Sequence, residues 1–351
     1  MLHTTNKIAL TLLAALAVVS CTKVEPTAPT PSVPDAIIFS PTDVETIDKG
    51  RGATLVGSGA AGMTELRKQD IGVFGNCTQG GSTIEMFDNV KVGYNKWPDN
   101  DNHEGWSYNP IRSWEGGQYE FRAYWPATVL VEGTATAENL AIRYDMTTTT
   151  QTDLMVARHV CASGNNGQPV PLKFRHALSA VSVKFQKGEG VEYTYTIKQV
   201  YFTGLLSRGA LIYNSDVPDV DLSEEWWIDP SSRGTSSIPI RNWTGDKVVP
   251  TKSNINNYVI DWELMIPQSL VVAADEERPS VTFVVEMDWG TGSHEVTTTM
   301  PLPTTGEGVP NAWKAGKMYS YLITVQPNTA DIEVITTDWD VVNAYSEDII
   351  L

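Results

Sequence analysis

Tyr119-Glu-Phe-Arg-Ala-Tyr-Trp125 indicates the fold class, because apolar and polar side chains begin to alternate there with a period of two. Such alternation is typical of a β-strand. Further runs with strand character are 71–74, 181–185, 191–197, 281–285 and 318–325. Clusters of Gly, Pro, Asn or Asp, which favour turns, bound these runs, and only residues 63–69 suggest a helical turn or two. The sequence therefore predicts an all-β protein.

A polar, glycine-rich stretch, Ser163-Gly-Asn-Asn-Gly-Gln-Pro169, separates the runs into two similar halves. It has no periodicity, which is typical of a boundary between folding units. The 351 residues are enough for about two domains. We therefore expect two β-sandwich domains in tandem, over residues 52–168 and 169–351.

The N-terminus has the pattern of an export signal. Lys7 precedes an apolar run, residues 8–19, which ends at Ser20-Cys21. The run is too short to span a bilayer, so residues 1–20 are expected to be a signal peptide. A small residue before Cys21 resembles a bacterial lipoprotein box, in which the signal is cleaved before the cysteine and the sulfur carries a diacylglycerol. Residues 22–34 contain four prolines and suit a tether.

The composition excludes several partners. The formal net charge is −17, so the surface repels nucleic acid and anionic lipid headgroups. After Cys21, the chain has two cysteines, Cys77 and Cys161. In an oxidising compartment these could form a disulfide, and two buried free thiols are the alternative. No cysteine or histidine spacing matches a zinc site, and we expect neither metal nor cofactor.

Motifs that would indicate an enzyme lack the required context. Gly57-Ser-Gly-Ala-Ala-Gly62 matches a dinucleotide fingerprint, but no parallel α/β pattern surrounds it, so we expect a flexible loop. The acidic stretch 99–105 does not keep calcium-loop spacing. His159 and Cys161 would share one strand face without being positioned as base and nucleophile, and His176 is expected to pack in the core. We expect no catalysis.

Aromatic side chains suggest a different kind of site. Five tryptophans lie near predicted loops, where they could stack on sugars or fill the mouths of sandwich cores. We favour the core interpretation. These tryptophans are Trp97, Trp106, Trp114, Trp226 and Trp227.

Several short patterns together resemble the fimbrillin family of Bacteroidales type V pilins and their Mfa-like relatives. The patterns are Phe174-Arg-His-Ala-Leu-Ser-Ala-Val-Ser-Val-Lys-Phe185, Ile266-Pro-Gln268, Ala312-Trp-Lys-Ala-Gly-Lys-Met-Tyr-Ser-Tyr321 and Trp339. Residues 71–74 and 119–126 fit the same family. The resemblance implies Greek-key, transthyretin-like sandwiches in a structural or adhesive subunit of a cell-surface fimbria.

The resemblance also implies a mode of assembly. Such pilins are exported as lipoproteins, and an arginine-specific protease then removes an N-terminal segment, which opens a groove for another subunit's strand. Ala36-Ile37-Ile38-Phe39 reads as a short removable strand within residues 21–51. Lys49-Gly-Arg51-Gly52 is a basic, accessible site for the cut. Two alternatives stay open: an uncut turn there, or a cut at the downstream pair Arg67-Lys68.

The C-terminus ends in an apolar triplet, Ile349-Ile350-Leu351, after Tyr345. An apolar end is expected to be buried, either in a sheet of the same subunit or in the groove of a neighbouring subunit. We favour the neighbour, which makes this segment a donor strand. Expected partners are thus other pilin subunits, the outer membrane through lipid, and a ligand on a host or bacterial surface. The alternative function is an outer-membrane lipoprotein that binds glycans through exposed tryptophans.

Overall fold

The computed structural model describes residues 35–44, 59–95, 105–129, 131–133, 135–147, 152–216, 220–234, 238–239, 247–249, 262–327 and 330–338. Nearly all regular structure in these ranges is β-strand, so the all-β prediction is confirmed. The helical elements are α1 (Gly59–Leu66) and the short 3-10 turns η1 (Ser163–Gly167), η2 (Leu222–Glu225) and η3 (Pro230–Ser232). No helix among the described residues is long and apolar enough to span a membrane.

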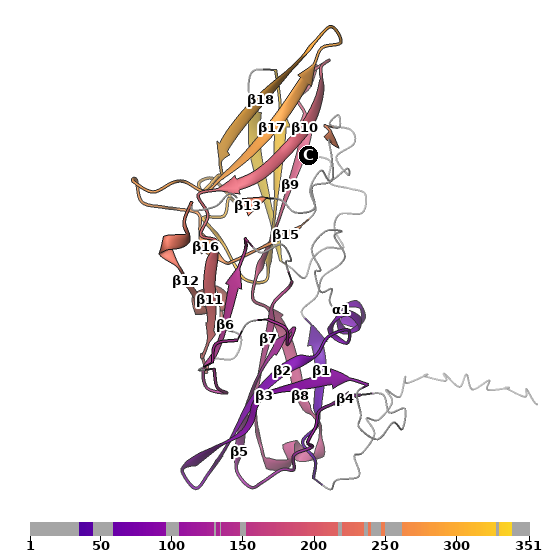
Figure 1. Ribbon diagram of the computed structural model, residues 1–351, viewed down its shortest axis with the longest axis vertical. Coiled ribbons are helices and arrows are strands. Elements are labelled where there is room, and N and C mark those ends of the chain that lie inside the picture. The colour runs from indigo at the N-terminus through magenta and orange to yellow at the C-terminus, as the bar shows by residue number, and fades with distance from the viewer. Residues whose placement is uncertain are drawn as a thin grey trace, which may run out of the picture.

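A seven-stranded sheet forms the lower part of the molecule in Figure 1. Its order is β1 (Phe39–Val44), β8 (Val170–His176), β7 (Met155–Ala162), β5 (Gln118–Trp125), β2 (Ile71–Gln79), β3 (Ser82–Tyr94) and β4 (Trp106–Ser107). All neighbours are antiparallel except β1 and β8, which are parallel. One face of this sheet encloses a core of its own, centred on Phe39, Phe87 and Phe121.

The upper part contains four smaller sheets. One has the order β15 (Glu263–Met265), β9 (Ser179–Lys187), β20 (Lys317–Val325) and β21 (Ala330–Asp338). A second has β13 (Ile238–Pro239), β10 (Thr194–Thr203), β17 (Ser280–Asp288) and β18 (Ser293–Pro301), with β14 (Lys247–Val248) paired to β10. The others are β12 (Trp226–Ile228), β11 (Arg208–Tyr213) and β6 (Leu140–Asp145), and the pair β16 (Gln268–Ser269) and β19 (Ala312–Trp313).

The two large upper sheets face each other across a second core. Phe185 on β9 and Phe283 on β17 meet edge to face, with ring centroids 5.1 Å apart. Both side chains are almost fully buried. Contacts of this kind between inward-facing aromatic residues are what hold two sheets together in a sandwich.

Strand pairing crosses the predicted boundary near residue 168 in both directions. β8 follows the boundary but belongs to the seven-stranded sheet, and β6 precedes it but pairs with β11. Phe74 and Tyr124, from the seven-stranded sheet, also join the upper core. The division into domains at 52–168 and 169–351 stays a prediction.

The predicted strands are present with shifted ends. β10 begins at Thr194 and not at Val191, because Gly190 adopts a positive φ of 71° and the chain is still in a turn. The helix at 63–69 is also present but begins four residues earlier, at Gly59. Residues 59–62, expected in a flexible loop, are helical.

Candidate functional site

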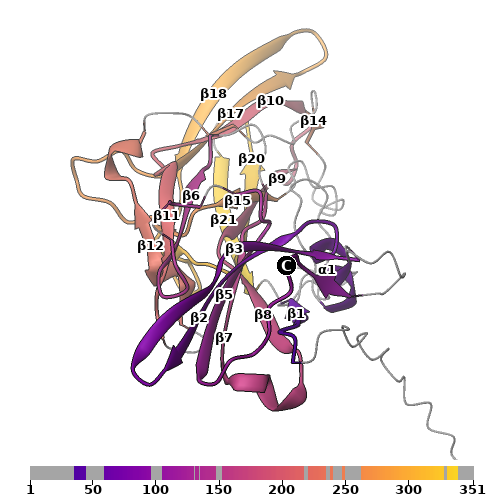
Figure 2. The same ribbon diagram turned by 60° about the horizontal axis from the view of Figure 1, so that its bottom comes forward.

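The segment that contains β1 lies at one edge of the seven-stranded sheet. On one side, the Val170 N–H donates to the Ile38 carbonyl at 2.7 Å, and β1 continues in parallel register along β8. On the other side, the Ile37 N–H donates to the Arg112 carbonyl at 2.8 Å. Figure 2 shows β1 lying beside β8. The segment is therefore bonded to β8 on one side and to the chain between β4 and β5 on the other.

Side chains that point inward from this segment fill an aromatic pocket. Ile37 is fully buried and Phe39 is 2% exposed. The Phe39 ring centroid lies 5.3 Å from those of Phe87 and Phe121 and 5.8 Å from that of Tyr108. Burying these two apolar side chains contributes about 1.5–3 kcal/mol each.

Tyr108 ties the pocket to the backbone of the same segment. Its hydroxyl donates to the Ile37 carbonyl at 2.8 Å and accepts the Arg112 N–H at 3.3 Å. Burial raises the pKa of Tyr108 to about 12, so the phenol keeps its proton and remains a donor at neutral pH. This residue was not singled out in the sequence, because only the fold places it beside Ile37.

The ladder between β1 and β8 is irregular. Pro41 in β1 lies opposite Leu172, and Pro171 in β8 lies opposite Ser40. The register shifts between Pro41 and Asp43. The burial of Ile37 and Phe39 adds to the main-chain hydrogen bonds that hold the segment.

The predicted removable strand, Ala36 to Phe39, overlaps this segment but has different bounds. Regular β-structure begins at Phe39 and continues to Val44, whereas Ala36 forms an isolated bridge with Ser113. The remaining assembly residues, namely Cys21, Arg51, Tyr345, Ile349, Ile350 and Leu351, lie outside the described residues. Their roles stay predictions.

The two cysteines are free. Cys77 on β2 and Cys161 on β7 both pair with Tyr119 on the intervening strand β5. Two strand spacings, roughly 10 Å, exceed the span of about 7 Å that a disulfide bridges. Of the two alternatives drawn from the sequence, the structure therefore has free thiols.

The groups considered for catalysis are not activated. Burial raises the pKa of the Cys161 thiol to about 11, and burial lowers the pKa of His159, so neither residue is charged at neutral pH. His176 is buried, with its Nδ1 2.9 Å from Asp153 Oδ2. Among the described residues, no cluster of His, Cys, Asp or Glu could hold a metal ion.

The glycine-rich motif is not in a dinucleotide-binding context. Its helical part, in α1, leads into β2, whose partners β3 and β5 are both antiparallel to it. A dinucleotide fingerprint instead requires a parallel βαβ unit. Of the calcium-loop stretch 99–105, only Gly105 lies within the described residues.

Four of the five tryptophans near predicted loops can be placed. Trp106 and Trp226 are buried, at 6% and 8% exposure, and Trp114 packs against the lower core. Trp227 is 58% exposed. Trp97 lies outside the described residues. The core interpretation thus holds for three of them and fails for Trp227.

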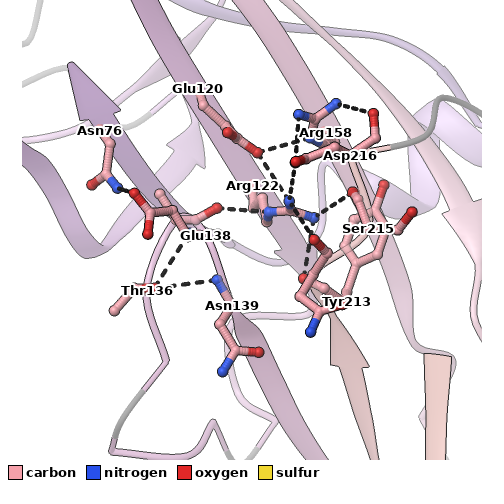
Figure 3. A network of polar contacts seen from close by, with 12 residues as sticks. Asn76, Glu120, Arg122, Thr136, Glu138, Asn139, Arg158, Tyr213, Ser215 and Asp216 are labelled. Carbon is pink, nitrogen blue, oxygen red and sulfur yellow. Dashed lines mark hydrogen bonds and ion pairs between the residues drawn. The ribbon is translucent and has the colours of Figure 1, made fainter. Parts of the chain in front are cut away.

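A polar network joins the lower sheet to the upper body (Figure 3). Arg122 on β5 has no exposed surface, and its Nε donates to the Ala137 carbonyl at 2.6 Å. Its Nη1 and Nη2 reach the Tyr213 and Asn214 carbonyls at 3.1 and 3.2 Å. Burial lowers the pKa of Arg122, and Glu120, 3.0 Å away, opposes that shift.

Arg158 on β7 completes this network. Its Nε donates to Glu120 Oε1 at 2.8 Å, and its Nη2 lies 3.1 Å from Asp216 Oδ1. Glu120 therefore bridges two guanidinium groups, one buried and one near the surface. Because the partners come from both halves of the molecule, the network fixes how the upper body sits on the lower sheet.

A family model described as fimbrillin-like matches residues 61–339. The chain belongs to the fimbrillin-like family. The resemblance found in the sequence is thereby confirmed, and no curated protein matches the chain.

One solved structure shares the fold of this chain, and others are similar at lower TM-scores. A fimbrial protein from Bacteroides vulgatus is 15% identical, with a TM-score of 0.60, over 87% of this chain and 99% of that one. A protein assigned to cell adhesion from Parabacteroides distasonis is 12% identical, with a TM-score of 0.49, over 88% and 96%. One assigned to cell adhesion from Bacteroides uniformis is 15% identical, with a TM-score of 0.46, over 87% and 98%.

The fimbrillin-like patterns have structural roles. The stretch 174–185 leaves the seven-stranded sheet at His176 and enters β9 at Ser179, so it is the crossover between the two parts. Trp226 Nε1 donates to the Ala177 carbonyl at 2.9 Å within this crossover. Gln268 is 4% exposed and bonds both the N–H and the carbonyl of Leu206. These residues stabilise the scaffold.

Proposed function

We propose that this protein is a structural or adhesive subunit of a cell-surface fimbria that assembles by exchange of strands between subunits. The observation that carries the proposal is β1. It is a terminal, parallel strand of an otherwise antiparallel sheet, and Ile37 and Phe39 of its segment are buried in the lower core. Such a strand can leave without disrupting the antiparallel order of the remaining six.

Removal of the segment before residue 52 would create an acceptor site. The edge of β8 and the backbone near Arg112 would lose their partners, and Phe87, Tyr108 and Phe121 would lose the Phe39 ring. Unpaired backbone groups beside an apolar trough are the features that β-augmentation uses. The strand of another subunit would restore both the hydrogen bonds and the burial.

The cut is proposed to follow Arg51. It lies between β1 and α1 in the sequence, so cleavage there would separate residues 1–51, including β1, from the rest. The donor is proposed to be the C-terminal segment of a neighbouring copy, with Tyr345, Ile349, Ile350 and Leu351 as its apolar contacts. The sequence supports this choice because that segment ends in three consecutive aliphatic residues.

Export is proposed to proceed through lipidation of Cys21, which would place the uncut subunit at the outer membrane. Cys21→Ala should leave unprocessed precursor and abolish labelling of the protein by a fatty-acid probe. Normal labelling of this variant would refute the lipoprotein assignment without affecting the proposal for β1.

Protease treatment of matched variants tests the assembly step. Wild-type protein cut by an arginine-specific protease should form oligomers that resist mild detergent, because each donated strand restores a hydrogen-bonded ladder. Arg51→Ala should remain monomeric. Arg67→Gln removes the competing basic site, an exposed arginine directly after α1, and should assemble as the wild type does.

Two results would overturn the proposal. One is a cleaved wild-type protein that stays monomeric at every concentration tested. The other is Arg51→Ala protein that still assembles after protease treatment. If Arg67→Gln alone blocked assembly, the cut would lie after Arg67 and the assignment of Arg51 would be wrong.

A further inference from the structure

The outward face of the sheet β12-β11-β6 forms an open groove with a volume of about 970 Å³. These three strands lie side by side at the left in Figures 1 and 2. Small side chains, Ala141 and Ala210, form the floor, and the segment that includes Thr128 and Glu132 forms one wall. The Glu132 N–H donates to the Ala141 carbonyl at 2.9 Å, which fixes this wall to β6. The volume falls within the range of about 300–1,000 Å³ that is typical of sites for small ligands.

Trp227 forms the opposite wall of the groove. Trp226 and Trp227 are neighbours on β12, so their side chains point to opposite faces. Trp226 is buried in the upper core, whereas Trp227 is 58% exposed and lines the groove. Ala210 on β11 lies opposite Trp227 on β12 and opposite Arg143 on β6. An aromatic ring, a methyl group and a guanidinium group therefore form one row across the sheet.

The charged groups of the groove already have partners in the protein. Arg143 Nε pairs with Glu132 Oε1, and Arg208 Nη2 lies 3.4 Å from Asp229 Oδ2. Asp145 Oδ1 accepts both the N–H and the hydroxyl of Thr147. Three carboxylates and two guanidinium groups thus line the groove, which leaves an excess negative charge. An anionic ligand would be repelled, on a chain whose net charge is −17.

We propose that this groove binds a neutral oligosaccharide, with one sugar ring stacked on the indole of Trp227. The C–H face of a pyranose is apolar and flat, which suits an exposed aromatic ring beside an alanine floor. Its hydroxyl groups both donate and accept, so they match a rim of paired carboxylates and guanidinium groups without needing a free charge. The site is remote in the fold from the β1 pocket, and the proposal does not depend on strand exchange.

Titration calorimetry on the purified, uncut full-length chain tests the proposal. The probes are neutral trisaccharides built from mannose, galactose, glucose or N-acetylglucosamine, with sialyllactose as an anionic comparison. Titration to about 10 mM detects dissociation constants of roughly 1–5 mM. We expect at least one neutral trisaccharide to bind and sialyllactose to bind more weakly.

Two tryptophan variants localise the binding. Trp227→Ala should weaken it about tenfold or more, because an aromatic anchor at the centre of a site carries much of the affinity. Trp289→Ala is the matched control, since Trp289 is 45% exposed in the turn between β17 and β18 and does not line the groove. It should leave the affinity unchanged. Circular dichroism should be the same for both variants, because neither side chain is buried.

Three outcomes would overturn the proposal. The first is that none of the neutral trisaccharides binds. The second is that Trp289→Ala weakens binding as much as Trp227→Ala does. The third is that a peptide with the sequence of residues 345–351, and none of the sugars, binds in a manner that depends on Trp227, which would make the groove a site for another copy of this chain.

Discussion

Replacing Phe39 by alanine in the uncut chain measures how firmly β1 is held. The side chain is 2% exposed, and its ring contacts three other aromatic rings at centroid distances of 5.3–5.8 Å. A Phe-to-Ala change at such a site lowers the free energy of unfolding by about 3–5 kcal/mol. For a unit of this size, each kcal/mol corresponds to about 2–4 °C in melting temperature.

The matched control is Thr42→Ala, because Thr42 lies on the same strand with an exposed side chain. It should change the free energy of unfolding by no more than about 0.5 kcal/mol. Urea denaturation followed by tryptophan fluorescence is a suitable assay, since Trp125, almost fully buried, and Trp114 contribute to the lower core. The transition of interest is the one that exposes these two indoles.

The same variant has a second use after proteolysis. If cleavage after Arg51 removes β1, the cut forms of wild-type and Phe39→Ala protein have the same sequence and should be equally stable and assemble equally. The uncut Phe39→Ala chain should, in contrast, accept a donor peptide more readily than the uncut wild type. A change of less than about 1 kcal/mol in the uncut chain would refute the role given to the pocket. A difference that persists after cleavage would refute the removal of β1.

Arg122→Leu should lower the free energy of unfolding by about 3 kcal/mol or more, because it leaves buried carbonyls without a donor, whereas Lys68→Ala, at an exposed pair, should change it by about 0.5 kcal/mol or less. In a Cys77→Ser background, Cys161 should be alkylated more slowly in the folded chain than in the unfolded chain near pH 8, because burial raises the pKa of this thiol to about 11 and leaves less thiolate; equal rates in the two states would contradict this. Deleting residues 345–351 should leave the melting temperature of the uncut monomer nearly unchanged and abolish its capacity to donate a strand; a large drop in melting temperature would assign the tail to its own sheet.

Local pattern was sufficient to locate the strands. Alternation over 119–125 and the β-rich run 318–325 correspond to β5 and β20 within one residue. The family could also be recognised from the sequence, because its patterns are short and contiguous in the chain. The ends of β10 and α1 were displaced by three or four residues, since turn geometry at Gly190 and helix initiation at Gly59 depend on the surrounding chain.

The sequence did not predict that both faces of a strand are buried. Alternation such as that over 119–125 is typical of a strand with one solvent-exposed face, yet Arg122 and Tyr124 are buried against the upper body. The guanidinium of Arg122 is tolerated there because carbonyls from residues 137, 213 and 214 surround it. Residues 213 and 214 lie 91 and 92 positions from Arg122, so no local window contains the information.

The sequence alone determined the strand-forming segments, the excess negative charge and the family, because each depends on residue types at short spacing. Only the tertiary structure decided the order of the strands. That order places Cys77 and Cys161 two strands apart, pairs β1 with β8, and lays Trp227 across from Arg143. Strand order is set by contacts between residues far apart in the chain, whose free energies depend on the whole sheet and not on either segment by itself.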